Sequence, residues 1–252
     1  MGISTASAYL LLHGVALGLA QEHARSISII LIALAAMWAG FTCLQRAKER
    51  AGIALNWLAM AIAMFIWAGG MLAQLLPATS NQVLTNPDYS MILFVLYMAP
   101  LALALAIPGH EPRRVRCVDA TLALILGALF IASTLDHTLL STASEDEGLF
   151  ALRRLLDVGN LFIFAFALIR LHASIVPEQR SLYRALSIYA GSYLLVATYI
   201  NHVEPADSDY GGHADLLIAT PFLLLAMFSR QTSIRPPRRP PVPRRARHRR
   251  SS

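Results

Sequence analysis

Histidine and carboxylate residues stand at the edges of several apolar stretches, where their side chains could bind a ligand: Asp136, His137, His202, Glu204, His213 and Asp215. Neutral imidazoles with carboxylates bind divalent cations, and imidazoles titrating at about pH 6.5 sense protons. The loop 203–212 joins His202 to His213, so we expect these two to lie near one another. The spacing matches no metal-ligand motif, however, and such residues are also common where helices leave lipid. A sensing cluster and ordinary interfacial residues therefore both stay open, and we predict no metal ion and no cofactor.

A second candidate is the pair Asp157 and Asn160, which share one helical face in LLDVGNLFIF. An acidic residue inside a membrane segment is a functional candidate by default. Arg153 lies four residues before Asp157, so a structural ion pair on one helix face is the alternative. We keep both interpretations.

Signatures of membrane enzymes are absent from the sequence. It contains no HxxxH, HExxH or CxxC motif, and the apolar stretch 214–230 has no Lys for a retinal Schiff base. The stretches 52–76, 89–108 and 214–230 carry no charged residue in their middles, which counts against a transporter. We therefore predict that the chain has no catalytic activity of its own.

The elements that carry these residues are predicted to be membrane-spanning helices. Hydrophobic residues make up 56% of the 252 residues and charged ones 14%. A helix needs about 20 apolar residues to cross a bilayer. Seven segments meet this need: 26–45, 52–76, 89–108, 117–136, 152–171, 183–202 and 214–230. The sequence thus predicts an all-α, polytopic helical bundle in which 26–230 form the membrane domain, with the lipid bilayer as its main partner.

Charges in the connecting loops predict the orientation of this bundle. Basic residues gather in every second connection: Arg46, Lys48 and Arg50, then Arg113, Arg114 and Arg116, then Arg170, Arg180 and Arg184. Acidic residues occupy the others: Asp88, then Glu145, Asp146 and Glu147, then Glu204, Asp207 and Asp209. The positive-inside rule then predicts the N-terminus outside and the C-terminus inside, in a multi-pass protein of the cell (inner) membrane. Arg153 and Arg154 are exceptions.

Residues 1–25 and 231–252 flank the membrane domain. The apolar stretch AYLLLHGVALGLA, 8–20, is either a signal-like segment with a cleavage site near Ala20 or a short eighth helix. Eight of the 21 basic residues, all Arg, lie in 231–252, so the rest of the chain carries a formal charge of −2 despite the total of +6. We predict a disordered cytoplasmic tail, because its prolines oppose a helix, and its arginines suit anionic lipid. It lacks aromatic residues to stack on bases, which argues against nucleic acid.

Prolines interrupt two of the predicted helices, at Pro100 in VLYMAPLALAL and at Pro221 in LLIATPFLLLA. Proline in a membrane helix frees a carbonyl group and favours a kink. Each kink is either a hinge that takes part in signal transmission or a static bend that helps packing. The aromatic residues along the helices are interpreted as interface anchors and packing: Trp57, Trp67, Tyr89, Tyr97, Tyr189 and Tyr193.

The order of the apolar segments and their residue composition resemble the N-terminal multi-helix sensor region of bacterial GGDEF-type diguanylate cyclases. The resemblance covers about residues 26 to 232 and rests on QRAKERAGIALNWLAMAIAMFIWAGG, YSMILFVLYMAPLALALAIP, EPRRVRCVDATLALIL, LRRLLDVGNLFIFAFALIRL and a last helix ending in SRQ. It implies a membrane module ahead of a cytoplasmic output domain, and that output domain is absent here. The tail stands where a family member begins its linker, so a stump or an out-of-frame end is expected.

The resemblance implies a membrane-embedded signal-input module without a catalytic domain, acting through a cytoplasmic signalling partner or a homodimer. The alternative is a small membrane transporter or enzyme that uses the histidine and acid residues of the outer face. A measurement of metal or proton binding after replacing the histidines separates the two hypotheses.

Overall fold

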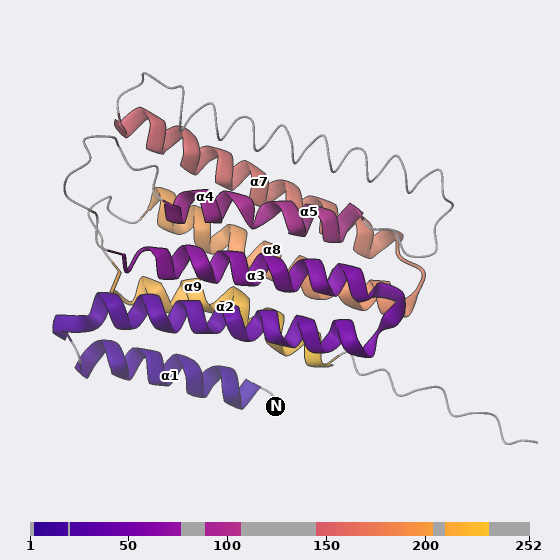
Figure 1. The fold of residues 1–252 in the computed structure, drawn as a ribbon, viewed down its shortest axis with the longest axis horizontal. Coiled ribbons are helices and arrows are strands. Elements are labelled where there is room, and N and C mark those ends of the chain that lie inside the picture. Colours follow the sequence, from indigo (N-terminus) through magenta and orange to yellow (C-terminus); the bar gives the residue numbers. More distant parts are fainter. Residues whose placement is uncertain (1–2, 20, 77–88, 107–144, 204–209, 232–252) are drawn as a thin grey trace, which may run out of the picture.

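The computed structural model describes residues 3–19, 21–76, 89–106, 145–203 and 210–231 (Figure 1). Every regular element within these ranges is a helix, so the prediction of an all-helical chain is confirmed there. The predicted segment 117–136 and the tail 232–252 lie outside the described residues. So do three of the candidate ligand-binding residues, Asp136, His137 and Glu204.

The helices run nearly side by side along the long axis of the molecule (Figure 1). Their bounds are α1 Ile3–Leu19, α2 Ala24–Glu49, α3 Ala54–Ala73, α4 Tyr89–Leu96, α5 Met98–Ala106, α7 Glu145–Ala173, α8 Pro177–His202 and α9 Ala214–Gln231. Two short 3-10 helices, η1 Gln21–His23 and η2 Ala51–Ile53, precede α2 and α3.

Three of these helices are long and apolar enough to cross a membrane, within the part of the chain that is described: Ala24–Glu49, Ala51–Ala73 and Arg154–Ala173. The stretches Ser4–Leu19 and Ile92–Ala106 are apolar but shorter. Helix α8 covers the predicted segment 183–202 but begins at Pro177, because proline is well suited to the first turn of a helix. Helix α7 likewise begins before the apolar segment 152–171, at Glu145.

The sequence predicts a membrane helix over 89–108 with a kink favoured by Pro100, and within 89–106 the structure has an interruption near that proline. The chain forms two helices there, and Tyr97 separates α4 from α5. Proline lacks an amide hydrogen, and its ring opposes the carbonyl group four residues earlier. For Pro100 that carbonyl belongs to Leu96, which is the last residue of α4. Pro221, by contrast, lies inside α9 without dividing it.

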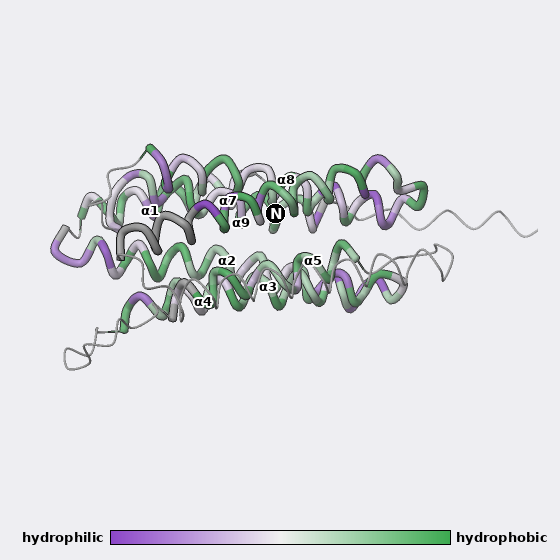
Figure 2. Tube along the Cα trace, turned by 90° about the horizontal axis from the view of Figure 1, so that it is seen from above, coloured by the Kyte–Doolittle hydropathy of each residue, from purple (hydrophilic) through white to green (hydrophobic). Residues whose placement is uncertain are grey.

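The helices form two layers (Figure 2). Helix α3 packs between α2 and the pair α4 and α5 in one layer, and α8 packs between α7 and α9 in the other. The layers meet where α2 contacts α9 and where α5 contacts α7. Helix α1 lies at one edge and packs against both α2 and α9, so residues 3–19 are part of the packed bundle.

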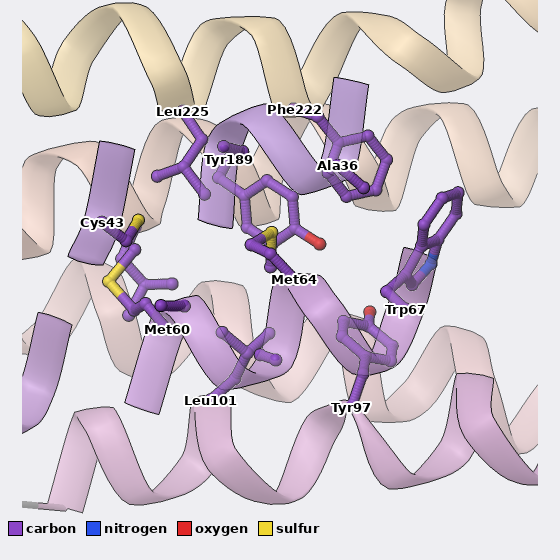
Figure 3. Close-up of a cluster of buried hydrophobic side chains, with 14 of the residues drawn as sticks. Ala36, Cys43, Met60, Met64, Trp67, Tyr97, Leu101, Tyr189, Phe222 and Leu225 are labelled. Atoms are coloured by element: carbon purple, nitrogen blue, oxygen red, sulfur yellow. The ribbon is translucent and has the colours of Figure 1, made fainter. Parts of the chain in front are cut away.

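One hydrophobic core runs between the layers and includes buried side chains from α2, α3, α5, α7, α8 and α9. Its centre is aromatic. Trp67, Tyr97, Tyr189 and Phe222 are each at most 2% exposed, and Figure 3 shows them converging from different helices. The interpretation of Trp67, Tyr97 and Tyr189 as packing residues is therefore confirmed, and their burial in the core does not suit them to anchoring at a membrane interface.

Polar contacts define two ends of the bundle. At one end, which we call the Arg46 end, Arg46 contacts the last turn of α9 and Arg50 forms an ion pair with Glu178 at 2.8 Å. At the other, which we call the Asp215 end, lie the start of α9, the end of α8 and the loop residues 210–213. Helices α2 and α9 run in the same direction, and α8 runs antiparallel to both, so the starts of α2 and α9 and the end of α8 lie together at the Asp215 end.

Candidate functional site

Three of the candidate residues that the structure describes, Asp157, His202 and Asp215, belong to two hydrogen-bonded groups at the Asp215 end. The first group joins α7 to α8. Asp157 on α7 accepts a hydrogen bond from the side-chain amide of Asn201 at 2.9 Å and lies 2.6 Å from Nε2 of His202. The His202 side chain is 38% exposed and that of Asp157 is 15% exposed, so solvent reaches this pair.

Asn160 does not belong to the same group, although it lies three residues after Asp157. Its side-chain carbonyl accepts a hydrogen bond from the hydroxyl of Tyr97 at 2.5 Å, and Asn160 is 5% exposed. Asp157 thus contacts α8, while Asn160 contacts the residue at the break between α4 and α5. The side chain of Arg153, the predicted partner of Asp157, lies outside the described residues.

The second group centres on Asp215 in the first turn of α9. Its Oδ2 atom accepts a hydrogen bond from the Ser28 hydroxyl at 2.5 Å and another from the backbone N–H of Gly211 at 2.6 Å. Gly211 has φ of 114°, a conformation that favours glycine. A Cβ atom there would also stand 3.1 Å from the backbone nitrogen of Arg25. The loop before α9 can therefore come close to the start of α2 and bind the Asp215 carboxylate.

His13 on α1 extends this second group. Its Nε2 atom lies 3.0 Å from the Ser28 hydroxyl oxygen. His13 and Ser28 are each 0% exposed and Asp215 is 4% exposed, so the three side chains form a buried chain across α1, α2 and α9. Among the described residues no partner lies within hydrogen-bond distance of His13 Nδ1.

Sequence reasoning missed His13 and Ser28. His13 was visible as a polar interruption of the apolar stretch 8–20, but nothing in the sequence connects it with partners 15 and 202 positions further on. The predicted cluster of His202, His213 and Asp215 is divided in the structure. His202 contacts Asp157, Asp215 contacts Ser28, and His213 is exposed.

The order of the buried chain decides what chemistry it supports. In a serine hydrolase the histidine stands between serine and aspartate and accepts the serine proton. Here Ser28 stands in the middle and donates its proton to Asp215, so its oxygen is not activated as a nucleophile. No group of three or more His, Cys, Asp or Glu residues that could hold a metal ion occurs among the described residues. The arrangement is suited to holding helices together and to exchanging protons.

A further polar group lies at the Arg46 end and binds the C-terminal turn of α9. Arg46 is 7% exposed, and its guanidinium donates hydrogen bonds to the backbone carbonyls of Ser229 and Arg230. It also donates to Glu49 at 2.7 Å, and the guanidinium of Arg230 lies 5.9 Å from the ring centre of Trp38. The last carbonyls of a helix have no partner within the helix, so Arg46 satisfies groups that α9 leaves unpaired.

The two hinge candidates occupy different surroundings. Pro221 is buried within α9, and the next residue, Phe222, packs 4.3 Å from the Trp67 ring between centroids. Pro100 is half-buried, three residues after the break at Tyr97. Whether either proline acts as a hinge or as a static bend stays a prediction.

Helix α9 is therefore bound to α2 at both ends, through Ser28 near its start and through Arg46 near its finish. The contact at the start of α9 includes the buried ionisable residue Asp215, and the contact at its end is made by the buried Arg46. A change in protonation or ligand contact at Asp215 would thus act on the same helix whose last turn Arg46 binds. Comparison of the chain with protein-family models, with curated proteins and with solved structures found no match.

Proposed function

We propose that this chain is a membrane-embedded signal-input module, and that α9 connects its outer face to the cytoplasm. The observation that carries the proposal is the pair of polar attachments between α2 and α9. Asp215 in the first turn of α9 is bound by Ser28, and the carbonyls of Ser229 and Arg230 in the last turn are bound by Arg46. A signal that weakens the contact between Ser28 and Asp215 would let α9 move, and that movement would alter the contact of Arg46 with the last turn of α9.

The proposed topology is a seven-helix bundle with the Asp215 end outside and the Arg46 end in the cytoplasm. The charge distribution supports it. Arg46, Lys48, Arg50, Arg180 and Arg184 belong to the Arg46 end, where the positive-inside rule expects basic residues. Arg25 and Arg154 belong to the opposite end and run against the rule.

Aromatic side chains in the core connect α9 to α3 and α8. Phe222, next to Pro221, packs against Trp67 of α3 and against Tyr189 and Tyr193 of α8. Trp67 in turn donates a hydrogen bond to the Tyr193 hydroxyl at 2.8 Å. A shift of α9 near Pro221 would therefore disturb packing across both layers, because protein interiors are too dense to absorb it locally.

The output would pass to the residues after α9, which include the eight arginines of 231–252. A cytoplasmic signalling protein or a second copy of this chain is the proposed receiver, in line with the resemblance to the input regions of diguanylate cyclases. Anionic lipid would hold the basic tail near the membrane surface, because each Arg beside an anionic leaflet contributes about 1 kcal/mol.

A distance measurement in the full-length protein tests this proposal. In a Cys43→Ala, Cys117→Ala background, spin labels are placed by Lys48→Cys on α2 and Gln231→Cys on α9, and the protein is reconstituted in lipid nanodiscs. We expect Asp215→Asn to change the distance distribution between these labels at the far end of the bundle. The matched control is Asp157→Asn, which alters the α7–α8 contact and leaves the ends of α9 untouched.

Equal distance distributions in the two variants would contradict the role of α9. The alternative function, a small transporter or membrane enzyme, is favoured by the solvent-exposed contact between His202 and Asp157. It would replace the proposal if the purified chain in liposomes moved ions or hydrolysed substrate, and if Asp157→Asn abolished that activity.

A further inference from the structure

The hydrogen bonds that join His13, Ser28 and Asp215 determine which atoms carry the hydrogens. A serine hydroxyl has one hydrogen, and Ser28 donates it to Asp215. In the contact between Ser28 and His13, the hydrogen must therefore come from Nε2 of His13, with the serine oxygen as acceptor. A neutral imidazole that carries its hydrogen on Nε2 has a bare lone pair on Nδ1.

That lone pair belongs to one of five buried side-chain polar atoms that have no hydrogen-bond partner among the described residues. His13 is 0% exposed, and among the described residues nothing lies within hydrogen-bond distance of its Nδ1 atom. Buried polar atoms nearly always have a partner, and an exception calls for an explanation. Nδ1 of His13 is thus a buried acceptor with room for one hydrogen.

We propose that Nδ1 of His13 is a proton-binding site, with Asp215 as its counter-charge and Ser28 as the connection between them. The bound ligand is a single proton. This inference goes beyond the proposed function, because it concerns proton binding by the buried chain itself and holds whether or not α9 carries a signal.

The carboxylate of Asp215 favours the proton. The path from the His13 ring to Oδ2 of Asp215 consists of two hydrogen bonds of 3.0 and 2.5 Å, so the positive ring would stand close to the carboxylate. Burial lowers the pKa of His13, and the negative charge of Asp215 acts against this by raising it. Ser28 transmits the interaction, because its hydroxyl accepts from the ring while it donates to Asp215.

Other titratable groups surround the site on each element packed against it. On α1, the Tyr9 ring lies edge-on to the His13 ring at 6.3 Å, and its hydroxyl donates to the carbonyl of Leu31. At the start of α2, Arg25 is exposed, as are Glu22 and His23 in η1. Before α9, His213 is exposed. Asp215 is the charged group connected to His13 by hydrogen bonds.

Proton uptake is linked to the position of α1. The added hydrogen turns Nδ1 from an acceptor into a donor, and the described residues offer it no acceptor. Burying a charged donor without a partner is costly, so the protonated state favours an arrangement in which Nδ1 meets water or a carbonyl group. Since His13 lies on α1, that arrangement requires α1 to move relative to α2 and α9.

Nuclear magnetic resonance of the full-length protein in lipid nanodiscs tests the site directly. The histidine rings are isotope-labelled, and the His13 signal is identified by its loss in His13→Gln. We expect this signal to titrate between about pH 4 and pH 9. In Asp215→Asn and in Ser28→Ala its proton affinity should fall roughly tenfold or more. Asp157→Asn is the matched control and should leave it unchanged.

A His13 signal that does not titrate in this range would overturn the proposal. So would a titration that Asp215→Asn and Ser28→Ala shift no more than Asp157→Asn does.

A second measurement uses neither Asp215→Asn nor Ser28→Ala, so it does not depend on the folding of these two variants. A spin label at Leu19→Cys on α1, in the cysteine-free background, reports the mobility of this helix across the same pH range. We expect the mobility to change with pH when His13 is present and to lose that change in His13→Gln, whereas His23→Gln keeps it. An identical pH response in His13→Gln would refute the link to α1.

Discussion

At the scale of single residues, several polar side chains buried in this bundle bind backbone groups or one another across helices. Arg46 is the clearest case. It is 7% exposed and donates to the last carbonyls of α9, which have no partner within their own helix. Arg50, one turn further along the chain, forms a more exposed ion pair with Glu178. The two arginines therefore differ in how much their contacts contribute to stability.

Replacing Arg46 by Met should lower the free energy of unfolding by about 2 to 4 kcal/mol, because buried carbonyl groups lose their donors. Arg50→Met should cost less than about 1 kcal/mol, since exposed ion pairs contribute little. Unfolding of both variants by denaturant in detergent micelles measures the difference. Arg46→Lys should be intermediate, because an ammonium group cannot reproduce the planar array of donors. Equal losses for Arg46→Met and Arg50→Met would contradict this assignment.

At the scale of elements, close helix packing depends on small residues at the contacts. Gly70 on α3 faces Phe94 on α4, and a Cβ atom at Gly70 would stand 2.7 Å from the Phe94 ring. Phe94 in turn packs 5.4 Å from the Trp67 ring between centroids. Small residues allow helix backbones to approach closely in membranes. The distance between α3 and α4 therefore depends on the absence of a side chain at Gly70.

Gly70→Leu should destabilise the protein by about 1 to 3 kcal/mol, because the added side chain must displace Phe94 and α4. Gly18→Leu on α1 is the matched control, since no heavy atom lies within 4 Å of a Cβ placed there. The control also accounts for the gain in helix propensity that follows any replacement of glycine by leucine, about 1 kcal/mol. The two variants are compared by thermal unfolding in the same detergent. A Gly70→Leu variant as stable as Gly18→Leu would mean that α4 adjusts without cost.

At the scale of the whole molecule, the two ends of the bundle differ in charge and in contacts. The Arg46 end contains five basic residues, Arg46, Lys48, Arg50, Arg180 and Arg184, whereas the Asp215 end contains Asp157, Asp215 and the exposed histidines His202 and His213 together with Arg25 and Arg154. An asymmetry of this kind predicts how a bundle inserts into a membrane, because basic loops remain in the cytoplasm.

Cysteine labelling in spheroplasts tests that orientation. In the Cys43→Ala, Cys117→Ala background, His213→Cys should react with a membrane-impermeant maleimide from outside, whereas Lys48→Cys should react after the membrane is permeabilised. Lys48 and His213 are both exposed, so a difference between them reports the side of the membrane. The reverse pattern would show that the bundle inserts with the Arg46 end outside.

The sequence by itself determined that the described chain is helical and determined most helix positions. Long apolar runs such as 26–45 must form helices in lipid, because a helix satisfies every backbone hydrogen bond within one segment. At 89–108 the sequence predicts a helix with a kink at Pro100, and the structure divides the described part, 89–106, into α4 and α5 near that proline, which lacks an amide hydrogen.

Only the tertiary structure decided which polar residues meet. Asp157 and Asn160 share a helix face, yet Asp157 contacts His202 and Asn160 contacts Tyr97. Each side chain binds whichever segment lies beside its own turn of α7. Ser28 and Asp215 are 187 residues apart, and so no local pattern connects them. Helix formation depends on neighbours in the sequence, whereas hydrogen bonding between helices depends on how the layers pack. That physical difference is why the helices were predictable and the buried chain from His13 to Asp215 was not.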